Sequence, residues 1–491
     1  MPRISGSSTF EGVLIDWSID QPVSPARLPV ELLSRNQVAA ELQRRQRRQA
    51  MEAAYEAELI LRLAELTSDE HDPPAGTPGA RNPGWGAGDD PVGVSEFFAG
   101  ELAMVLNRGR GTANHLHCRA QAWRDNLPAT FRALADGELD LARAAALADV
   151  LGNTRSELAV AIEALLLPEA VDLSVAGLKR RALELLLELD AAAAEERREQ
   201  AKRSADVFLQ PGADGMATLG AELSADEAAE AYALIDQLAR MLKADGDQRP
   251  IAQLRTELFS LLLRRPGGHD QPAVTAHLTI TATLDSLAGV STTAGSMNGL
   301  AITAAHAREL LTRIAALGLQ APPGGNLTFA ITDPDGRLLA TTSVAELLRV
   351  AKKGCAEHPG GNCGCPVLGP APDTDAYQRT DRQEAFVKTR DRTCRMPNCG
   401  QRVGWTDLDH VIPHACGGAT ACLNLCCLCR SHHRLKTFAP GWRFAMEPDG
   451  TLYVTTPTGI TRTTRPPGLR TPPPEPPPEP PTQPDHDPPP F

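Results

Sequence analysis

The stretch LDHVIPHACGGATACLNLCCLCRSHHRLK, residues 408–436, decides how the C-terminal part of this chain folds. It gathers imidazole, thiol, carboxylate and amide groups that a hydrophobic core does not need and a metal site does. The chain has 11 cysteines, of which only Cys118 precedes Cys355, and the other ten lie between Cys355 and Cys429. This clustering indicates metal ligands before disulfides, because disulfide frameworks belong to short secreted chains.

Two ligand pairs flank the segment. Cys394 and Cys399 lie in CRMPNC, and Cys429 and His432 lie in CRSH. Two such pairs about thirty residues apart can surround one tetrahedral zinc ion, so the spacing predicts a structural zinc site rather than free thiols. Cys426 or Cys427 could replace Cys429 as a ligand. The surplus thiols of the segment are otherwise expected to be buried as small apolar groups; they are Cys416, Cys422, Cys426 and Cys427.

A second cluster lies upstream in CAEHPGGNCGC, residues 355–365. Its four donors are Cys355, His358, Cys363 and Cys365. Because all four are local in sequence, they could enclose a second zinc ion in a tight loop. The alternative is a flexible linker that carries thiols, and the spacing leaves both open.

Further polar residues lie between and after the first two pairs, namely Asp409, His410, Asn424, His433 and Lys436. If the segment around His432 is helical, His433 diverges from it by about 100° and can face a different site. Lys436, one turn further, could meet a phosphate. Asp409 and His410 would point to opposite faces of a regular strand, so they can share one site only where the strand ends or bends.

The pattern DHVIP…GGAT…N…C..HH..K resembles the HNH endonuclease module, a zinc-supported ββα-metal fold. The resemblance covers residues 388–445. It implies that His410 is the general base on water and that Asp409 and His433 hold Mg²⁺ or Mn²⁺. It also implies that Asn424 orients the loop, and that Gly417-Gly418 forms the family's loop turn.

Charge is unevenly distributed along the chain. The formal net charge is -12, yet residues 376–470 hold 14 Lys and Arg against 7 Asp and Glu. A basic segment on an acidic chain suits a polyanion-binding module, but charge alone does not decide between such a module and a solvated surface. The HNH resemblance implies that the polyanion is DNA. The candidate backbone contacts are Lys388, Arg390, Arg392, Arg395, Arg430, Arg434 and Lys436.

The preceding residues have mainly helical patterns. Residues 32–66 lack Gly and Pro and predict one long helix, while Ser224 and Glu227 form a capping box. Alternation predicts hairpins at 206–223 and 327–343 and a strand at 273–287. The expected organisation is an irregular N-terminus (1–30), a helical domain (31–270), a small α/β segment (271–350), a Cys-rich linker (351–375), the HNH module (376–446), and a C-terminal extension with a disordered Pro-rich tail (447–491).

The wider chain resembles an actinobacterial, especially mycobacterial, repeat-element family. The phrases VKTRDRTCRMPNCG, APGWRFAMEPDG, LPATFRALADGELDLARA and AQLRTELF carry this resemblance. Its members join a helical domain of unknown function to a C-terminal HNH nuclease. The helical domain brings no chemistry of its own to this expectation.

The sequence therefore predicts a multidomain, metal-dependent DNA endonuclease. Two alternatives stay open: a zinc-stabilised DNA-binding module without catalysis, or an interaction scaffold from a mobile element. The N-terminus lacks an apolar signal region, and no run of about 18 apolar residues indicates a membrane span. We therefore expect a cytoplasmic protein that does not enter a membrane; its protein partners are left unassigned.

Overall fold

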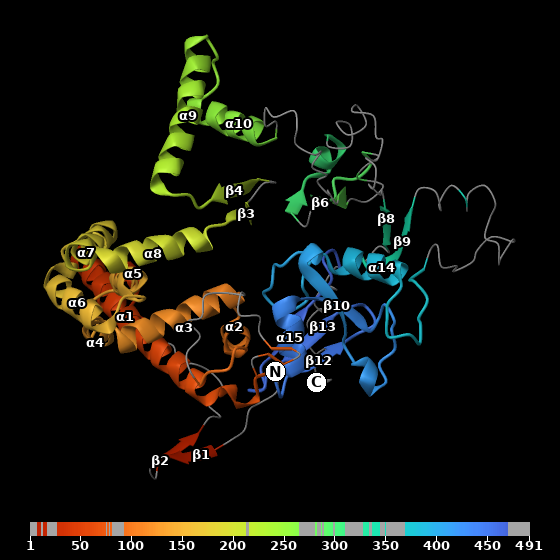
Figure 1. Cartoon of the computed structure of the whole chain (residues 1–491), viewed down its shortest axis with the longest axis horizontal. Coiled ribbons are helices and arrows are strands. Elements are labelled where there is room, and N and C mark those ends of the chain that lie inside the picture. Colours follow the sequence, from red (N-terminus) through yellow and green to blue (C-terminus); the bar gives the residue numbers. More distant parts are fainter. Residues whose placement is uncertain are drawn as a thin grey trace, which may run out of the picture. The chain divides into compact units, whose positions relative to one another are not determined.

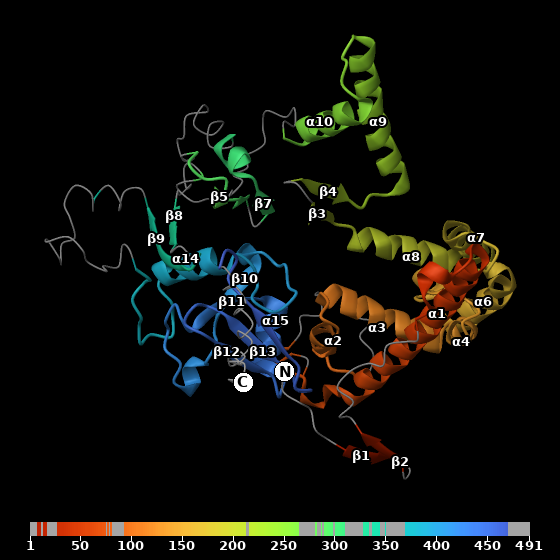
Figure 2. The same cartoon turned by 180° about the vertical axis from the view of Figure 1, so that it is seen from behind.

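The structure is a computed structural model, and the following description covers residues 7–10, 13–16, 27–74, 76–77, 79–80, 93–212, 216–264, 280–281, 286, 289–297, 300–309, 328–332, 336–343, 349 and 369–469. The chain divides into two compact units, each described by itself (Figures 1 and 2). One combines Met1–Leu61 with Cys118–Leu189, and the other combines Arg62–His117 with Asp190–Phe491. None of the described helices is both long and apolar enough to cross a membrane.

The first unit is a helical bundle. Its helices are the N-terminal part of α1 (Arg35–Leu66), the C-terminal part of α3 (Arg110–Asp125), α4 (Pro128–Ala135), α5 (Leu141–Leu151), α6 (Ser156–Ala170) and α7 (Val175–Leu189). Leu147, Ile162 and Leu178 are fully buried at its centre. Figure 1 shows α4–α7 gathered around α1. The many alanines of these helices allow their backbones to approach closely.

Residues 7–16, which we expected to be irregular, contain an antiparallel hairpin. Strand β1 (Ser7–Phe10) pairs with β2 (Val13–Asp16). Phe10, Val13 and Ile15 are residue types that favour extended backbone, which accounts for the pairing. The expectation of an irregular N-terminus is therefore wrong for these eight residues.

The second unit begins with the C-terminal part of α1, α2 (Phe98–Leu106) and the start of α3, and it resumes after the first unit. Its next elements are α8 (Ala191–Ser204), β3 (Val207–Pro211), β4 (Ala217–Ala221), α9 (Ala225–Ala244), α10 (Ile251–Arg264), β5 (Ile280–Thr281), β6 (Gly295–Met297), β7 (Leu300–Ile302), β8 (Thr328–Thr332) and β9 (Leu338–Ser343). Both predicted hairpins are confirmed, as β3–β4 and β8–β9. The capping box at Ser224 and Glu227 is confirmed too. Of the strand predicted at 273–287, Ile280 and Thr281 form β5, and Ser286, the other described residue of this range, is helical.

The C-terminal module contains the ligand pairs. Its elements are α14 (Asp381–Asp391), β10 (Thr406–His410), β11 (Leu425–Cys429), α15 (Arg430–Phe438), β12 (Arg443–Met446), β13 (Leu452–Thr455) and β14 (Thr461–Thr464). Strands β10 and β11 form an antiparallel hairpin, and α15 follows β11 directly. The β12–β13–β14 sheet shares a core with this hairpin and with α15, because Leu452 and Val454 pack with Leu428 and Leu435. The module therefore continues past the expected boundary at 446.

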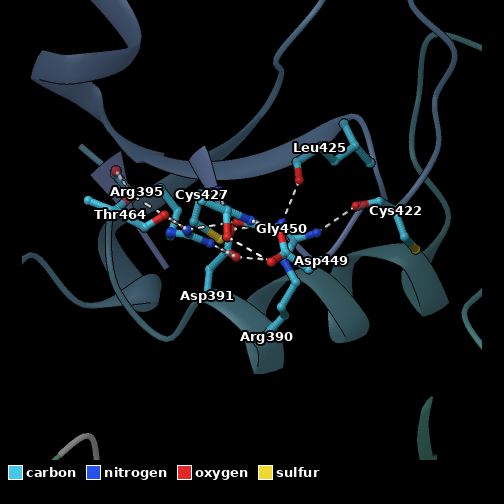
Figure 3. A network of polar contacts seen from close by, with 10 residues as sticks. Arg390, Asp391, Arg395, Cys422, Leu425, Cys427, Asp449, Gly450 and Thr464 are labelled. Carbon is cyan, nitrogen blue, oxygen red and sulfur yellow. Dashed lines mark hydrogen bonds and ion pairs between the residues drawn. The ribbon is translucent and has the colours of Figure 1, made fainter. Parts of the chain in front are cut away.

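A buried ionic network fastens α14 to the rest of the module (Figure 3). The Asp391 carboxylate is fully buried between the guanidinium groups of Arg390 and Arg395, at 2.7 Å and 2.9 Å. It also accepts the backbone N–H of Cys427 at 2.8 Å. Other donors of the two arginines reach backbone carbonyls, including Leu425 O at 2.6 Å and Gly450 O at 2.9 Å, while Nε of Arg395 is buried without a partner among the described residues.

This network corrects two of the expected nucleic-acid contacts. Arg390 is 6% exposed and Arg395 is 2% exposed, and their donors already bind Asp391 and backbone oxygens. A guanidinium that is buried and bonded in this way cannot reach a phosphate without breaking the core. The expectation that Arg390 and Arg395 contact DNA is therefore wrong, and both residues instead hold the buried Asp391 carboxylate.

Candidate metal centre

The two ligand pairs come together in the folded chain. Cys394 and Cys399 lie in the turn after α14, Cys429 ends β11, and His432 lies in the first turn of α15. The ligand atoms of these four residues lie within 4.8 Å of one another. Nδ1 of His432 is 3.2 Å from Sγ of Cys429 and 3.4 Å from Sγ of Cys394. The prediction that these four residues form one cluster is confirmed.

Local backbone geometry builds the first half of this cluster. The backbone N–H of Cys394 donates to Gln401 O at 2.7 Å, and that of Cys399 donates to Met396 O at 3.1 Å. Asn398, with φ of 61°, supplies the left-handed residue that closes the turn. The two thiols therefore face the start of α15 from a closed loop.

The chemistry of the donor set suits a metal ion such as zinc. Hydrogen bonds from the Cys394 and Cys399 thiols lower the pKa of Cys429, and the bonds with Cys399 and Cys429 raise the pKa of Cys394. Three sulfurs and one imidazole nitrogen are a set that Zn²⁺ accepts in tetrahedral geometry.

The surplus cysteines of the segment stand outside this cluster. Cys422, Cys426 and Cys427 are buried in apolar surroundings, as predicted, and burial raises the pKa of the Cys427 thiol to about 12. Cys416 is exposed, so the expectation of burial is wrong for it. Cys429, rather than Cys426 or Cys427, belongs to the cluster. The possible second zinc ligands, Cys355, His358, Cys363 and Cys365, lie outside the described residues.

A second group of polar side chains lies on the α15 side of strand β10. His433 Nε2 is 3.6 Å from Asp409 Oδ1, and His433 Nδ1 is 2.9 Å from Asp407 Oδ2. Asp407 and Asp409 share this face because alternate residues of a strand point the same way. His432 faces the sulfurs while the next residue, His433, faces these carboxylates. The divergence expected from helical geometry is therefore observed.

Asp407 was not among the residues that the sequence singled out. Its spacing of two residues from Asp409 on a predicted strand was the available signal. Its carboxylate also accepts from Arg430 Nη1 at 3.2 Å. The hydrogen bond to Nδ1 leaves Nε2 of His433 directed at Asp409, which is the orientation that metal-binding histidines usually have.

Lys436 clamps the end of strand β10. Its Nζ lies 2.9 Å from Asp409 Oδ2 and donates to His410 O at 2.7 Å. The Lys436 side chain is 8% exposed. The ammonium group is thus engaged by the strand, and the expectation that it meets a phosphate is not supported by this arrangement.

His410 has its side-chain contacts on the other face. Its Nε2 lies 2.8 Å from Oγ1 of the buried Thr420. Its ring stacks on Tyr377 at 5.4 Å and meets His414 edge-on at 5.8 Å. Among the described residues, these are its ring contacts, and His433 is not one of them. Asp409 and His410 therefore have their side-chain contacts on opposite sides of β10, as in a regular strand, although both were expected to serve one site. His410 is the last residue of β10, and Lys436 bonds to the Asp409 carboxylate and to the backbone carbonyl of His410.

The pKa of His410 is lowered. Burial is the main cause, and the positive charges of His414 and Lys436 act in the same direction, while the Asp409 carboxylate opposes them. An imidazole with a lowered pKa is neutral at neutral pH, so one ring nitrogen is free to accept a proton.

Asn424 fastens the loop between the two strands. Its Oδ1 accepts Ile412 N–H at 2.9 Å, and its Nδ2 donates to Ile412 O at 3.0 Å and Ala419 O at 2.9 Å. A Cβ at Gly418 would overlap Ile412 O, so the loop closes this tightly only with glycine there. Gly417 has φ of 87°, which also favours glycine.

The other expected nucleic-acid contacts differ in accessibility. Arg434 is 8% exposed, and its guanidinium binds both carboxylate oxygens of Glu96 and the carbonyl of Gly79, so its expected role as a free DNA contact is wrong. Lys388 is partly exposed beside Glu384, and Arg392 is partly buried beside Ser296. Arg430 is 62% exposed. Lys388, Arg392 and Arg430 thus stay candidates.

Comparison with known proteins gives a family and no activity. A model described as "Domain of unknown function (DUF222)" matches residues 84–329, half of the chain. Uncharacterized protein Rv3776 of Mycobacterium tuberculosis (strain ATCC 25618 / H37Rv) is 33% identical over 280 residues, which is 54% of this chain and 50% of that protein. Uncharacterized protein Rv2100 of the same strain is 36% identical over 146 residues, 30% of this chain and 25% of that protein. The chain thus spans half or less of the length of these relatives. No solved structure matches it.

Proposed function

The chain belongs to the DUF222 family, and on that premise we propose that its C-terminal module is an HNH-type endonuclease that hydrolyses DNA phosphodiester bonds with a divalent cation. The observation that carries the proposal is the convergence of Asp409 and His433 beside the Cys3His cluster. The hairpin β10–β11 followed by α15 supplies the ββα order that the proposal needs.

In this proposal, zinc at the four-ligand cluster has a structural role. Cys429 and His432 stand at the junction of β11 and α15, and Cys394 and Cys399 belong to the preceding turn. Zinc would therefore fix the start of α15 against the rest of the module. The position of His433, the next residue, depends on that junction.

Asp409 and His433 would hold the catalytic cation, Mg²⁺ or Mn²⁺. When bound, the cation would act as a Lewis acid on the scissile phosphate and its leaving oxygen. Asp407 would keep Nδ1 of His433 protonated, which leaves Nε2 as the donor to the metal. Lys436 would hold the second oxygen of Asp409 and so fix the orientation of that carboxylate.

His410 would act as the general base. The Thr420 hydroxyl donates to Tyr377 O at 3.5 Å, so it accepts from Nε2–H of His410 and leaves Nδ1 as the basic nitrogen. In the proposed reaction Nδ1 takes a proton from the attacking water. Asn424 would not react, and it would instead hold the loop that follows His410. DNA would be bound partly through Lys388, Arg392 and Arg430.

The test is plasmid nicking by the purified full chain with Mg²⁺ or Mn²⁺, compared with His410→Ala. Loss of nicking in His410→Ala supports the proposal, whereas equal cleavage by both proteins indicates a contaminating nuclease. Zinc content measured on both samples controls for unfolding of the module. The matched control is His71→Ala, because His71 is an exposed histidine on a separate 3-10 turn.

One observation favours a second candidate, a zinc-stabilised DNA-binding module without catalysis. The ring of His410 faces Tyr377 and Thr420 rather than His433. DNA binding by both the parent and His410→Ala, with nicking by neither under any divalent cation, would favour this second candidate.

A further inference from the structure

We infer that the hollow between α2–α3 and α15 binds the phosphodiester backbone of DNA, and that Arg110, within the DUF222-matched residues, is one of its contacts. The inference rests on the proposed function, because only that proposal identifies the bound polyanion as DNA. It gives the family-defining part of the chain a role in substrate binding, which neither the sequence pattern nor the family description assigns.

The two walls of the hollow are fixed to each other. Arg434 of α15 binds Glu96, just before α2, with N–O distances of 2.6 Å and 2.7 Å. The same guanidinium lies 5.7 Å from the ring centre of Phe97. Phe97 and Met104 belong to the same buried core as Cys429 and Leu435. The segment around α2 is thus part of the metal-bearing module, and the hollow does not depend on a loose contact.

The turn that carries Arg110 is held against the metal-ligand loop. Asn398 lies between Cys394 and Cys399 in that loop. Its Nδ2 donates to Oδ1 of Asn107, the residue after α2, at 2.9 Å. Arg462 of β14 donates to the final carbonyls of α2, those of Met104 and Val105. These bonds fix where α2 ends and α3 begins, and therefore where the backbone of Arg110 lies.

Arg110 lines two adjoining hollows. The larger, of about 430 Å³, runs between Glu96–Gly100, the first turn of α3 and the first turn of α15, where Arg430 and Ser431 also line it. The smaller, of about 270 Å³, includes Arg110 together with Cys399, Cys429 and His432. The exposed Arg110 side chain therefore lines both hollows, which share Arg110 and His432; these two hollows together are called the depression.

The charge of the depression suits a polyanion. Glu96 neutralises Arg434, and Arg430 shares Asp407 with His433. Arg110 forms no ion pair with any carboxylate in the part of the chain that the structure describes. An uncompensated guanidinium beside other cations attracts phosphate groups. Arg430 lines the depression and also contacts Asp407, which binds His433. A DNA strand that crosses the start of α15 would therefore run from the depression to the candidate cation site.

The experiment measures DNA binding by the full chain carrying His410→Ala, so that the probe is not cut. A short fluorescein-labelled duplex is titrated by anisotropy over a series of salt concentrations. Adding Arg110→Ala should weaken binding about 3- to 10-fold at low salt and reduce the salt slope by about 0.9. Arg108→Ala is the matched control, since Arg108 is exposed two residues away and lines neither hollow. It should change affinity less than about twofold.

Equal affinity and equal salt slope for the parent and Arg110→Ala would overturn the inference. Loss of bound zinc in Arg110→Ala would overturn it as well, because the guanidinium of Arg110 would then stabilise the Cys3His cluster rather than bind DNA. An absence of DNA binding in the parent would overturn both this inference and the proposed function. Binding that depends on Arg110, in a chain whose unmutated form does not nick DNA, would sustain the inference while the nuclease proposal fails.

Discussion

Oδ2 of Asp407 lies 2.9 Å from Nδ1 of His433, and this contact turns the other ring nitrogen of His433 toward Asp409. Two carboxylates on one strand face thus act on one imidazole from different sides. The first would set the tautomer, and the second would share the cation.

Replacing Asp407 is expected to weaken divalent-cation use. Asp407→Ala removes the acceptor for Nδ1, so the orientation of His433 is lost, and cation affinity or activity should fall about 10- to 100-fold. Asp407→Asn keeps an acceptor oxygen without the charge and should lie between Ala and the parent. Nicking measured against Mn²⁺ concentration checks this order. Asp381→Asn, an exposed acid at the start of α14, is the control, and an unchanged Mn²⁺ dependence in Asp407→Ala would contradict the expectation.

Removing one thiol of the four-ligand cluster should remove one zinc ion per chain. Cys429→Ser disrupts the donor set at the β11–α15 junction, and because the thiol lies in the module core, the melting temperature should also fall. Zinc is counted by elemental analysis of the full chain. The difference between parent and variant is the measured quantity, so any ion bound elsewhere cancels. Cys416→Ser, at an exposed cysteine outside the cluster, should leave the count unchanged; equal counts in the parent and Cys429→Ser would rule the cluster out as a zinc site.

The pair Glu96–Arg434 should couple α2 to α15 in stability. Both side chains are largely buried, so Glu96→Gln or Arg434→Met leaves a charge without its partner and should cost about 3–5 kcal/mol of unfolding free energy. The double variant should lose less than the sum of the single variants. Arg430→Met, at an exposed ion pair, should cost less than about 1 kcal/mol. Denaturant unfolding of the parent and the four variants gives these values, and strictly additive losses in the double variant would show that the pair is not coupled.

These residues also mark what could be predicted from sequence. The cluster Cys394–Cys399–Cys429–His432 was predictable because each ligand pair is set by a local turn or helix start. Strand alternation indicated that Asp409 and His410 could share one site only if the strand ended or bent there, and in the structure their side chains contact different partners. The burial of the basic residues was not predictable, because Arg434 meets Glu96, and Arg395 meets Gly450 O and Thr464 O, only in the folded core. Glu96 lies far from Arg434 in sequence, so no local pattern could reveal that the segment around α2 belongs to the module.

The ionised Asp391 carboxylate should make the stability of the module fall at acidic pH. Burial alone would raise the pKa of Asp391, but the charges and hydrogen bonds of Arg390 and Arg395 outweigh it and the pKa is lowered. A lowered carboxyl pKa adds stability above its ordinary value of about 3.9, and that stability is lost as pH falls through the lowered value. Asp391→Asn should lower the melting temperature at pH 7 and flatten its decline in acid. Melting curves at several pH values check this, and parallel declines in both proteins would contradict it.

The lowered pKa of His410 should shape the pH dependence of nicking. Burial lowers the pKa of His410, so the imidazole stays neutral, and the proposed base stays active, at pH values below the ordinary histidine pKa of about 6.5. As the solution is made more acidic, the nicking rate should therefore decline only below about pH 6.5. Thr420→Val removes the hydroxyl that holds Nε2, so the favoured tautomer is lost and the rate should drop while bound zinc stays constant. Thr420→Ser keeps the hydroxyl and should restore most of the rate. Single-turnover nicking from pH 5 to pH 8 measures both effects. If Thr420→Val and Thr420→Ser behaved alike, the hydroxyl would have no part in orienting His410, and the assignment of Nδ1 as the basic nitrogen would fail with it.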